Sequence, residues 1–147
     1  PASIGRCDTL QTLNLANTLV QDLRVLAPLI QLEKLVIYGC PVADVTPLWH
    51  MKALRHLNVS GTLITSIAAL AQLNQIELLD LSHTRISDIA ALAPLNSLRE
   101  LILRDTDVAE IAVLRQAVNL RILDVSFTPA AETVTELGLR ADMIIIH

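Results

Sequence analysis

The chain has 147 residues, of which 52% are hydrophobic, yet it contains only one Trp, one Tyr and one Phe. This length and aliphatic content, with 28 Leu residues, suit one folded domain and exclude a disordered chain. The net charge is −4 and the eleven Lys and Arg residues are scattered along the chain, which argues against nucleic acid as a partner.

Membrane insertion is not expected either, because uncharged apolar runs such as 67–71 and 143–146 are far shorter than the ~18 residues of a spanning helix. Cys7 and Cys40 form neither a CxxC pair nor a disulfide framework, which favours a reducing, intracellular compartment. The chain starts at Pro1 without a signal peptide, so we expect an excerpt or a processed product.

A gapless period of 22 residues organises the chain. The first position of each unit is Leu or Ile: Leu10, Leu32, Leu54, Ile76, Leu98 and Leu120. Position 4 is always Leu and position 6 is always aliphatic, so each unit predicts a short strand with two inward side chains. Residues 1–9 continue the register backwards as a partial coil.

The second half of each unit has apolar residues three apart. In the fourth repeat they are Ile86, Ile89, Leu92 and Leu95, and this spacing predicts 3₁₀ turns rather than another strand. After the sixth repeat, Val134 and Leu137 predict a shifted helical turn that ends near Gly138, and a closing strand follows at about 143–146. Residues 1–147 are thus predicted to form a single repeat domain.

The consensus L-x-x-L-x-L-x-x-T-x-[IV]-x-D-[IV]-x-x-L-x-x-L resembles the leucine-rich repeat of the 22-residue, internalin-like class. The segment 86–95, ISDIAALAPL, is especially similar to that class. The resemblance implies an α/β fold: a right-handed solenoid with a concave parallel β-sheet and a convex side of short 3₁₀ or helical turns.

Two polar rows accompany the repeat. The family usually has Asn at position 9, whereas this chain has Cys40 and five threonines, which we expect to bond neighbouring coils: Thr18, Thr62, Thr84, Thr106 and Thr128. Position 13 holds Asp, Ser or Glu just before the helical half, where an oxygen can cap the first turn. An acidic row could also bind cations, but local capping explains it without calcium.

No catalytic or cofactor motif is present. The chain has no zinc-ligand spacing, no phosphate-binding glycine loop and no G-x-S-x-G, so we expect no metal, no cofactor and no enzyme activity. The repeat does bring five polar residues into one region of the sheet: His56, Ser60, Asp80, Ser82 and His83. They could form a nucleophilic site, a metal site or a solvated polar patch. An open sheet with no oxyanion hole favours the patch.

Positions 3, 5 and 7 are expected to point away from the core and to form the concave face. Leu78, Ile102 and Ile122 would form an apolar stripe there, rimmed by polar residues that include Asp80. An alternative with equal weight is that these aliphatic residues are scattered over the surface or are covered by a further C-terminal segment. Anchor candidates beside the stripe are Val36, Tyr38, Arg104 and Phe127. Trp49, on the convex half, is assigned to packing.

The sequence therefore predicts a non-enzymatic module that binds a protein partner through its concave face. The alternative is the substrate-targeting domain of a larger enzyme or effector, suggested by the start within a coil and the missing caps. A third hypothesis is a structural spacer.

Overall fold

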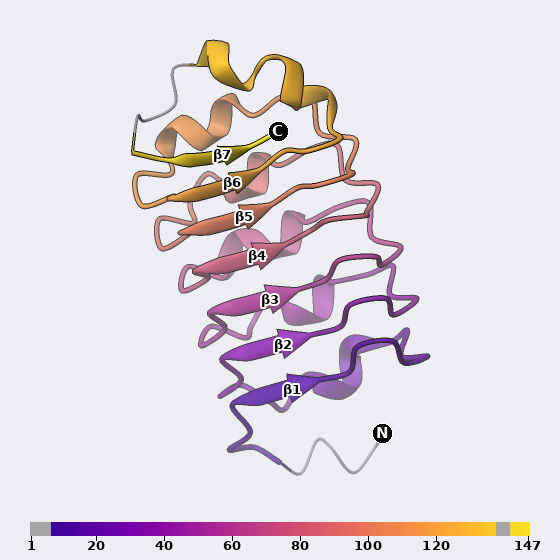
Figure 1. Cartoon of the computed structure of the whole chain (residues 1–147). Coiled ribbons are helices and arrows are strands. Elements are labelled where there is room, and N and C mark those ends of the chain that lie inside the picture. Colours follow the sequence, from indigo (N-terminus) through magenta and orange to yellow (C-terminus); the bar gives the residue numbers. More distant parts are fainter. Residues whose placement is uncertain (1–6, 138–141) are drawn as a thin grey trace.

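The structure is a computed structural model that describes residues 7–137 and 142–147. Most of the partial coil expected at 1–9, and the expected end of a turn at Gly138, lie outside the described residues. The described chain winds as a solenoid in which successive strands stack along one side and short turns along the other (Figure 1).

The strands of successive coils form one parallel sheet in the order β1-β2-β3-β4-β5-β6-β7. Equivalent residues of neighbouring repeats pair directly, as Leu13 does with Leu35 and Leu35 with Leu57, so the 22-residue period is also the sheet register. The strands are β1 (Thr12–Asn14), β2 (Lys34–Val36), β3 (His56–Asn58), β4 (Leu78–Asp80), β5 (Glu100–Ile102), β6 (Ile122–Asp124) and β7 (Ile144–Ile146).

Short 3₁₀ helices, three to five residues long, return the chain from each strand to the next. They are η2 (Leu23–Leu26), η3 (Thr46–Leu48), η4 (Ala68–Gln72), η5 (Ala90–Leu92), η6 (Ala112–Gln116), η7 (Pro129–Glu132) and η8 (Val134–Leu137). The predicted solenoid of strands and 3₁₀ turns is confirmed. None of the helices in the described ranges is long and apolar enough to cross a membrane.

The core is a continuous aliphatic column. Leu57 in β3 and Val59 just after it are fully buried, as are residues of the other half of the coil such as Leu73. The three aromatic residues all lie outside this column: Tyr38, Trp49 and Phe127 are 44%, 53% and 72% exposed. Each coil has a narrow interior of constant width, which aliphatic side chains of similar volume fill at normal density.

The polar residue at position 13 accepts a hydrogen bond at the start of the turn in the first four repeats. The main-chain amides two residues later donate to Asp22, Asp44, Ser66 and Asp88 at 2.9, 2.7, 3.4 and 2.8 Å. Asp22 is the N-cap of η2, as predicted, whereas η3, η4 and η5 have the next residue as N-cap, so there the side-chain oxygen binds the first amide of the turn. Hydrogen bonds from the side chain and the amide of Arg24 also lower the pKa of Asp22 to about 2.

The threonines at position 9 bond differently from the prediction. The hydroxyl of Thr62 donates to the carbonyl of Val59 at 2.6 Å, three residues earlier in the same coil. Thr18, Thr84, Thr106 and Thr128 make the equivalent bond. The expected bonding between coils is therefore wrong for these threonines. A short hydroxyl side chain readily bonds a nearby main-chain carbonyl, here the one three residues earlier. Cys40 is the exception, since its thiol donates to Leu15 of the preceding coil.

Candidate functional site

The concave face, which we define as the outward side of the sheet at positions 3 and 5, ends in a sharp turn. At position 8 of all six repeats the backbone adopts positive φ: Asn17 (57°), Gly39 (66°), Gly61 (62°), His83 (55°), Asp105 (54°) and Phe127 (59°). Gly, Asn and Asp tolerate this left-handed conformation, whereas a bulky aromatic residue is strained in it. Sequence reasoning missed this repeated turn, although Asn, Gly and Asp at the same position of different repeats indicate it.

Just before this turn, in four of the six repeats, the side chain at position 5 accepts a hydrogen bond from the main-chain amide two residues later. In the fourth repeat, Oδ1 of Asp80 accepts from the amide and the hydroxyl of Ser82 at 3.0 and 2.5 Å, and Oδ2 accepts from Asn58 at 2.8 Å. Asn14, Asn58 and Asp124 also accept from the amide two residues later. The carboxylate oxygens of Asp80, a predicted partner-binding residue, therefore accept hydrogen bonds from its own coil and from the preceding coil.

The serines at position 7 lie inside this turn rather than on the face. Ser60, Ser82 and Ser126 are only 3%, 7% and 6% exposed. The expectation that position 7 points to solvent is wrong for these coils, because the chain bends over immediately after position 5 and encloses the small hydroxyl under the bend. Positions 3 and 5 alone form the open face of these repeats.

The second and fifth repeats break the pattern. There, position 5 is Val36 or Ile102 and position 7 is Tyr38 or Arg104, so the side-chain acceptor and the buried serine are both missing. Tyr38 is exposed and Arg104 is half-buried. The ring of Tyr38 lies over the next coil, where a Cβ added to Gly61 would be 3.5 Å from it. The two departures lie three strands apart, at about 14 Å.

A hollow of about 230 Å³ opens on the concave face across β2, β3 and β4. Its outward-facing lining is Lys34, Val36, His56, Asn58 and Leu78. The register explains this grouping, since Lys34, His56 and Leu78 occupy position 3 of successive strands. Leu78 and Val36 thus line the same hollow, from strands that lie on either side of β3.

The predicted stripe of Leu78, Ile102 and Ile122 is not one line. Glu100 pairs with Leu78 on one side and with Ile122 on the other, so a carboxylate separates the two aliphatics, and all three predicted stripe residues are half-buried. On its other side, Ile122 pairs with Ile144 of β7, which is 62% exposed.

Ile146, 44% exposed, lies two residues further along the same face of β7. We call Ile102, Ile122, Ile144 and Ile146 the β5–β7 patch. The sequence indicated β7 as a closing strand but not as part of this surface.

Phe127 and Arg104 lie at the rim of this patch. The guanidinium carbon of Arg104 is 4.5 Å from the centroid of the Phe127 ring, within the range of a cation–π contact. Phe127 is the most exposed of the three aromatic residues. Two residues that sequence reasoning selected separately therefore form one unit.

The polar group weighed as a catalytic or metal site does not assemble. Both serine hydroxyls donate to side-chain oxygens at position 5, and Nδ1 of His83 lies 2.9 Å from Oδ2 of Asp105 rather than near a serine. In the part of the chain that the structure describes, no three His, Cys, Asp or Glu side chains form a group that could hold a metal ion.

Comparison with known proteins identifies the repeat. A family profile described as leucine rich repeats (2 copies) matches residues 52–94. An internalin of Listeria monocytogenes, InlF, superimposes with a TM-score of 0.87 over 99% of this chain and 43% of its own, at 25% identity. The repeat is therefore leucine-rich, and the chain is similar to internalins. No curated protein shows a significant sequence match to it.

Two further solved structures share the fold. Internalin C2 of Listeria monocytogenes has a TM-score of 0.82 at 24% identity, over 94% of this chain and 61% of its own. A leucine-rich-repeat protein of Leptospira interrogans has a TM-score of 0.89 at 22% identity, over 100% of this chain and 39% of its own. The internalin-like chain thus spans between about two fifths and three fifths of these three proteins. Its fold is that of a protein-interaction repeat module.

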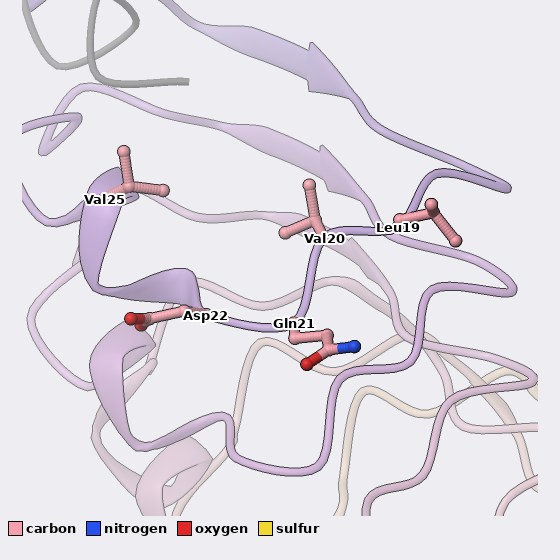
Figure 2. Close-up of a pocket in the computed structure, with 5 residues that line it drawn as sticks. All are labelled: Leu19, Val20, Gln21, Asp22 and Val25. Carbon is pink, nitrogen blue, oxygen red and sulfur yellow. The ribbon is translucent and has the colours of Figure 1, made fainter.

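A second hollow, of about 550 Å³, lies at the first coil of this leucine-rich-repeat protein. Figure 2 shows Val20 and Val25 projecting to the same side, whereas the carboxylate of Asp22 does not project to that side. Val20 is half-buried, whereas Val42, its equivalent one repeat later, is fully buried. The hollow follows from the lower packing of the first coil, and Asp22 is already bonded to Arg24, so we assign no ligand to it.

Trp49 lies on the convex side, as the sequence predicts. Its ring meets His50 edge-on at 5.5 Å, and the Lys52 ammonium lies 5.5 Å from the ring centroid. Lys52 also donates to the carbonyls of Trp49 and Gln72 at 2.7 and 3.1 Å. The bond from Lys52 to Gln72 joins this coil to η4, whereas the Trp49 ring contacts His50 and Lys52 of its own coil and is 53% exposed.

Proposed function

We propose that this chain acts as one non-enzymatic protein-binding unit that recognises its partner through the concave face. The single observation that carries the proposal is the break in the turn pattern at the second and fifth repeats. There, an acceptor and a buried serine give way to Val36 with Tyr38 and to Ile102 with Arg104. These two coils lack the hydrogen bond that the position-5 side chain accepts in the other coils. Such a bond contributes about 0.5–1.5 kcal/mol to the free energy of unfolding.

The residues gained at these two coils are of the kind that binds proteins. Tyr and Arg are among the side chains that most often dominate interface energetics. Aliphatic residues beside them, in the hollow and in the β5–β7 patch, provide apolar area inside a polar surround. The scaffold is a continuous hydrogen-bonded sheet, so binding would require little ordering of the backbone.

The intact coils supply the contrast. Asn58, Asp80 and Asp124 direct side-chain oxygens to their own turns, which leaves fewer free polar groups for a partner. We therefore expect these coils to set the shape of the face and the second and fifth coils to provide most of the binding free energy. The proposal places Leu78 and Val36 in one contact area and Ile102, Arg104 and Phe127 in another.

The test begins with the whole chain as bait and mass-spectrometric identification of the captured protein. Binding of the purified partner is then measured by calorimetry for two concave variants, Val36→Ser with Tyr38→Ser and Ile102→Ser with Ile122→Ser. The matched control is Ile30→Ser with Val118→Ser, which alters apolar residues of 54% and 57% exposure outside the face. Loss of affinity in the concave variants alone supports the proposal. Unchanged affinity, or an equal loss in the control, overturns it.

A further inference from the structure

Phe127 occupies a backbone position that does not suit it. Its φ is 59°, and the five other coils place Asn17, Gly39, Gly61, His83 and Asp105 there. A left-handed conformation is costly for a bulky side chain, and such strain is typical of functional sites. The ring gains no burial in return, because Phe127 is 72% exposed. Folding alone therefore does not explain a phenylalanine at this position.

Arg104 differs from the other arginines along the sheet. Arg55, Arg99 and Arg121 each pair with a carboxylate in a neighbouring coil. Among the described residues, Arg104 forms no ion pair with a carboxylate, and its guanidinium instead lies over the Phe127 ring. A guanidinium has five N–H donors, which suit a planar acceptor.

Nearby carboxylates are used elsewhere. Asp105 pairs with His83, and Oδ1 of Asp124 accepts from the amide of Ser126. Their charges, together with Glu100 at the other end of the same strand, make the surroundings of Arg104 unfavourable for a polyanion. A single carboxylate is the acceptor that suits one guanidinium in such surroundings, because it can bind two N–H groups in parallel.

We propose that Arg104 and Phe127, together with Ile102 and Ile122, recognise a polypeptide segment that carries Asp or Glu next to an aliphatic or aromatic residue. The acid binds the edge of the Arg104 guanidinium. The apolar neighbour packs on the exposed ring and on the β5–β7 patch. This inference rests on the proposed function and adds the chemistry of the partner at one of its two contact areas.

The test uses peptides from a random twelve-residue phage-display library, selected on the whole chain. We expect enriched sequences to pair Asp or Glu with an apolar residue. Binding of the enriched peptide, followed by fluorescence anisotropy, should weaken about 10-fold or more in Arg104→Gln and in Phe127→Asn, and equally when the peptide acid is changed to its amide. Arg104→Glu should regain binding when the peptide acid becomes Lys. Circular dichroism and thermal melting verify that each variant is folded.

A matched variant at the second coil, Lys34→Gln with Tyr38→Ser, separates this inference from the proposed function. Peptides that lose affinity in this variant and not in Arg104→Gln would overturn the Arg104–Phe127 site and leave the concave face as a binding surface. Peptides insensitive to both variants, or a library that yields no binder, would overturn both. Enriched peptides without an acid would overturn the chemistry assigned to the partner.

Discussion

The thiol of Cys40 donates to the main-chain carbonyl of Leu15 at 3.0 Å and lies 3.4 Å from the hydroxyl of Thr18. This bond joins the second coil to the first, at a position where the threonines bond within their own coil. Cys40 is fully buried, whereas Cys7 is exposed. The two cysteines thus differ in their access to solvent.

We predict that a thiol reagent such as DTNB modifies one cysteine per folded chain and a second only after unfolding, because reaction requires an accessible thiolate. The variant Cys7→Ser should show no reaction in the folded state, and its labelling rate under mild denaturant should follow the opening of the first two coils. Rapid modification of both cysteines in the native protein would contradict the burial of Cys40.

Removing the Asp80 carboxylate should destabilise the solenoid more than removing Asp124. Asp80 accepts three hydrogen bonds, from the amide and hydroxyl of Ser82 and from Asn58, whereas Asp124 accepts one, from the amide of Ser126. We expect Asp80→Ala to lower the free energy of unfolding by about 1–3 kcal/mol and Asp124→Ala by about 0.5–1.5 kcal/mol. Denaturation in urea measures both. Equal losses would show that the bonds to Ser82 Oγ and Asn58 contribute nothing.

Replacing Phe127 should leave stability unchanged or increase it. Asn tolerates positive φ, so Phe127→Asn relieves backbone strain while it loses the contact with Arg104. The two effects are each on the order of 1 kcal/mol, and we expect a net change between zero and a gain of about 1 kcal/mol. The control is Tyr38→Asn, at a residue without positive φ, which should not be stabilising. A clear loss of stability in Phe127→Asn would mean that the ring serves folding.

The free energy of unfolding at acid pH should depend on Asp22. Its pKa falls from 3.8 to about 2 in the folded chain because the side chain and amide of Arg24 donate to the carboxylate. A lowered pKa stabilises the fold above the ordinary value, and this contribution is lost as the pH falls from about 4 through the folded value. The stability advantage of the wild type over Asp22→Asn should therefore shrink over that range.

An NMR titration of the Asp22 carboxyl carbon gives a direct measurement of the same effect. In the variant Arg24→Gln the pKa of Asp22 should return towards 3.8, since the largest cause of the shift is removed. A pKa close to 3.8 in the wild type would refute the contact between Asp22 and Arg24.

Many residues of the candidate site could be selected from the sequence, but which of them contact one another could not be predicted. Tyr38, Arg104 and Phe127 stand out as anchor types at outward positions. The link between Arg104 and Phe127 could not be read from the repeat, because it depends on how two side chains of different positions and coils meet. Asp80 was selected as a surface acid, and only its bonds to Ser82 and Asn58 reveal its structural role.

The sequence by itself determined the solenoid. A 22-residue period with aliphatic residues two apart and then three apart leaves stacking as the way to bury each coil, so strand, turn and core positions follow from the spacing. Tertiary structure decided which outward residues are free. Ser82 is buried by the bend after its strand, Ile144 joins Ile122 through the register, and Phe127 is held at positive φ by the turn it occupies. These properties depend on distances and backbone angles between coils, which a residue pattern does not contain.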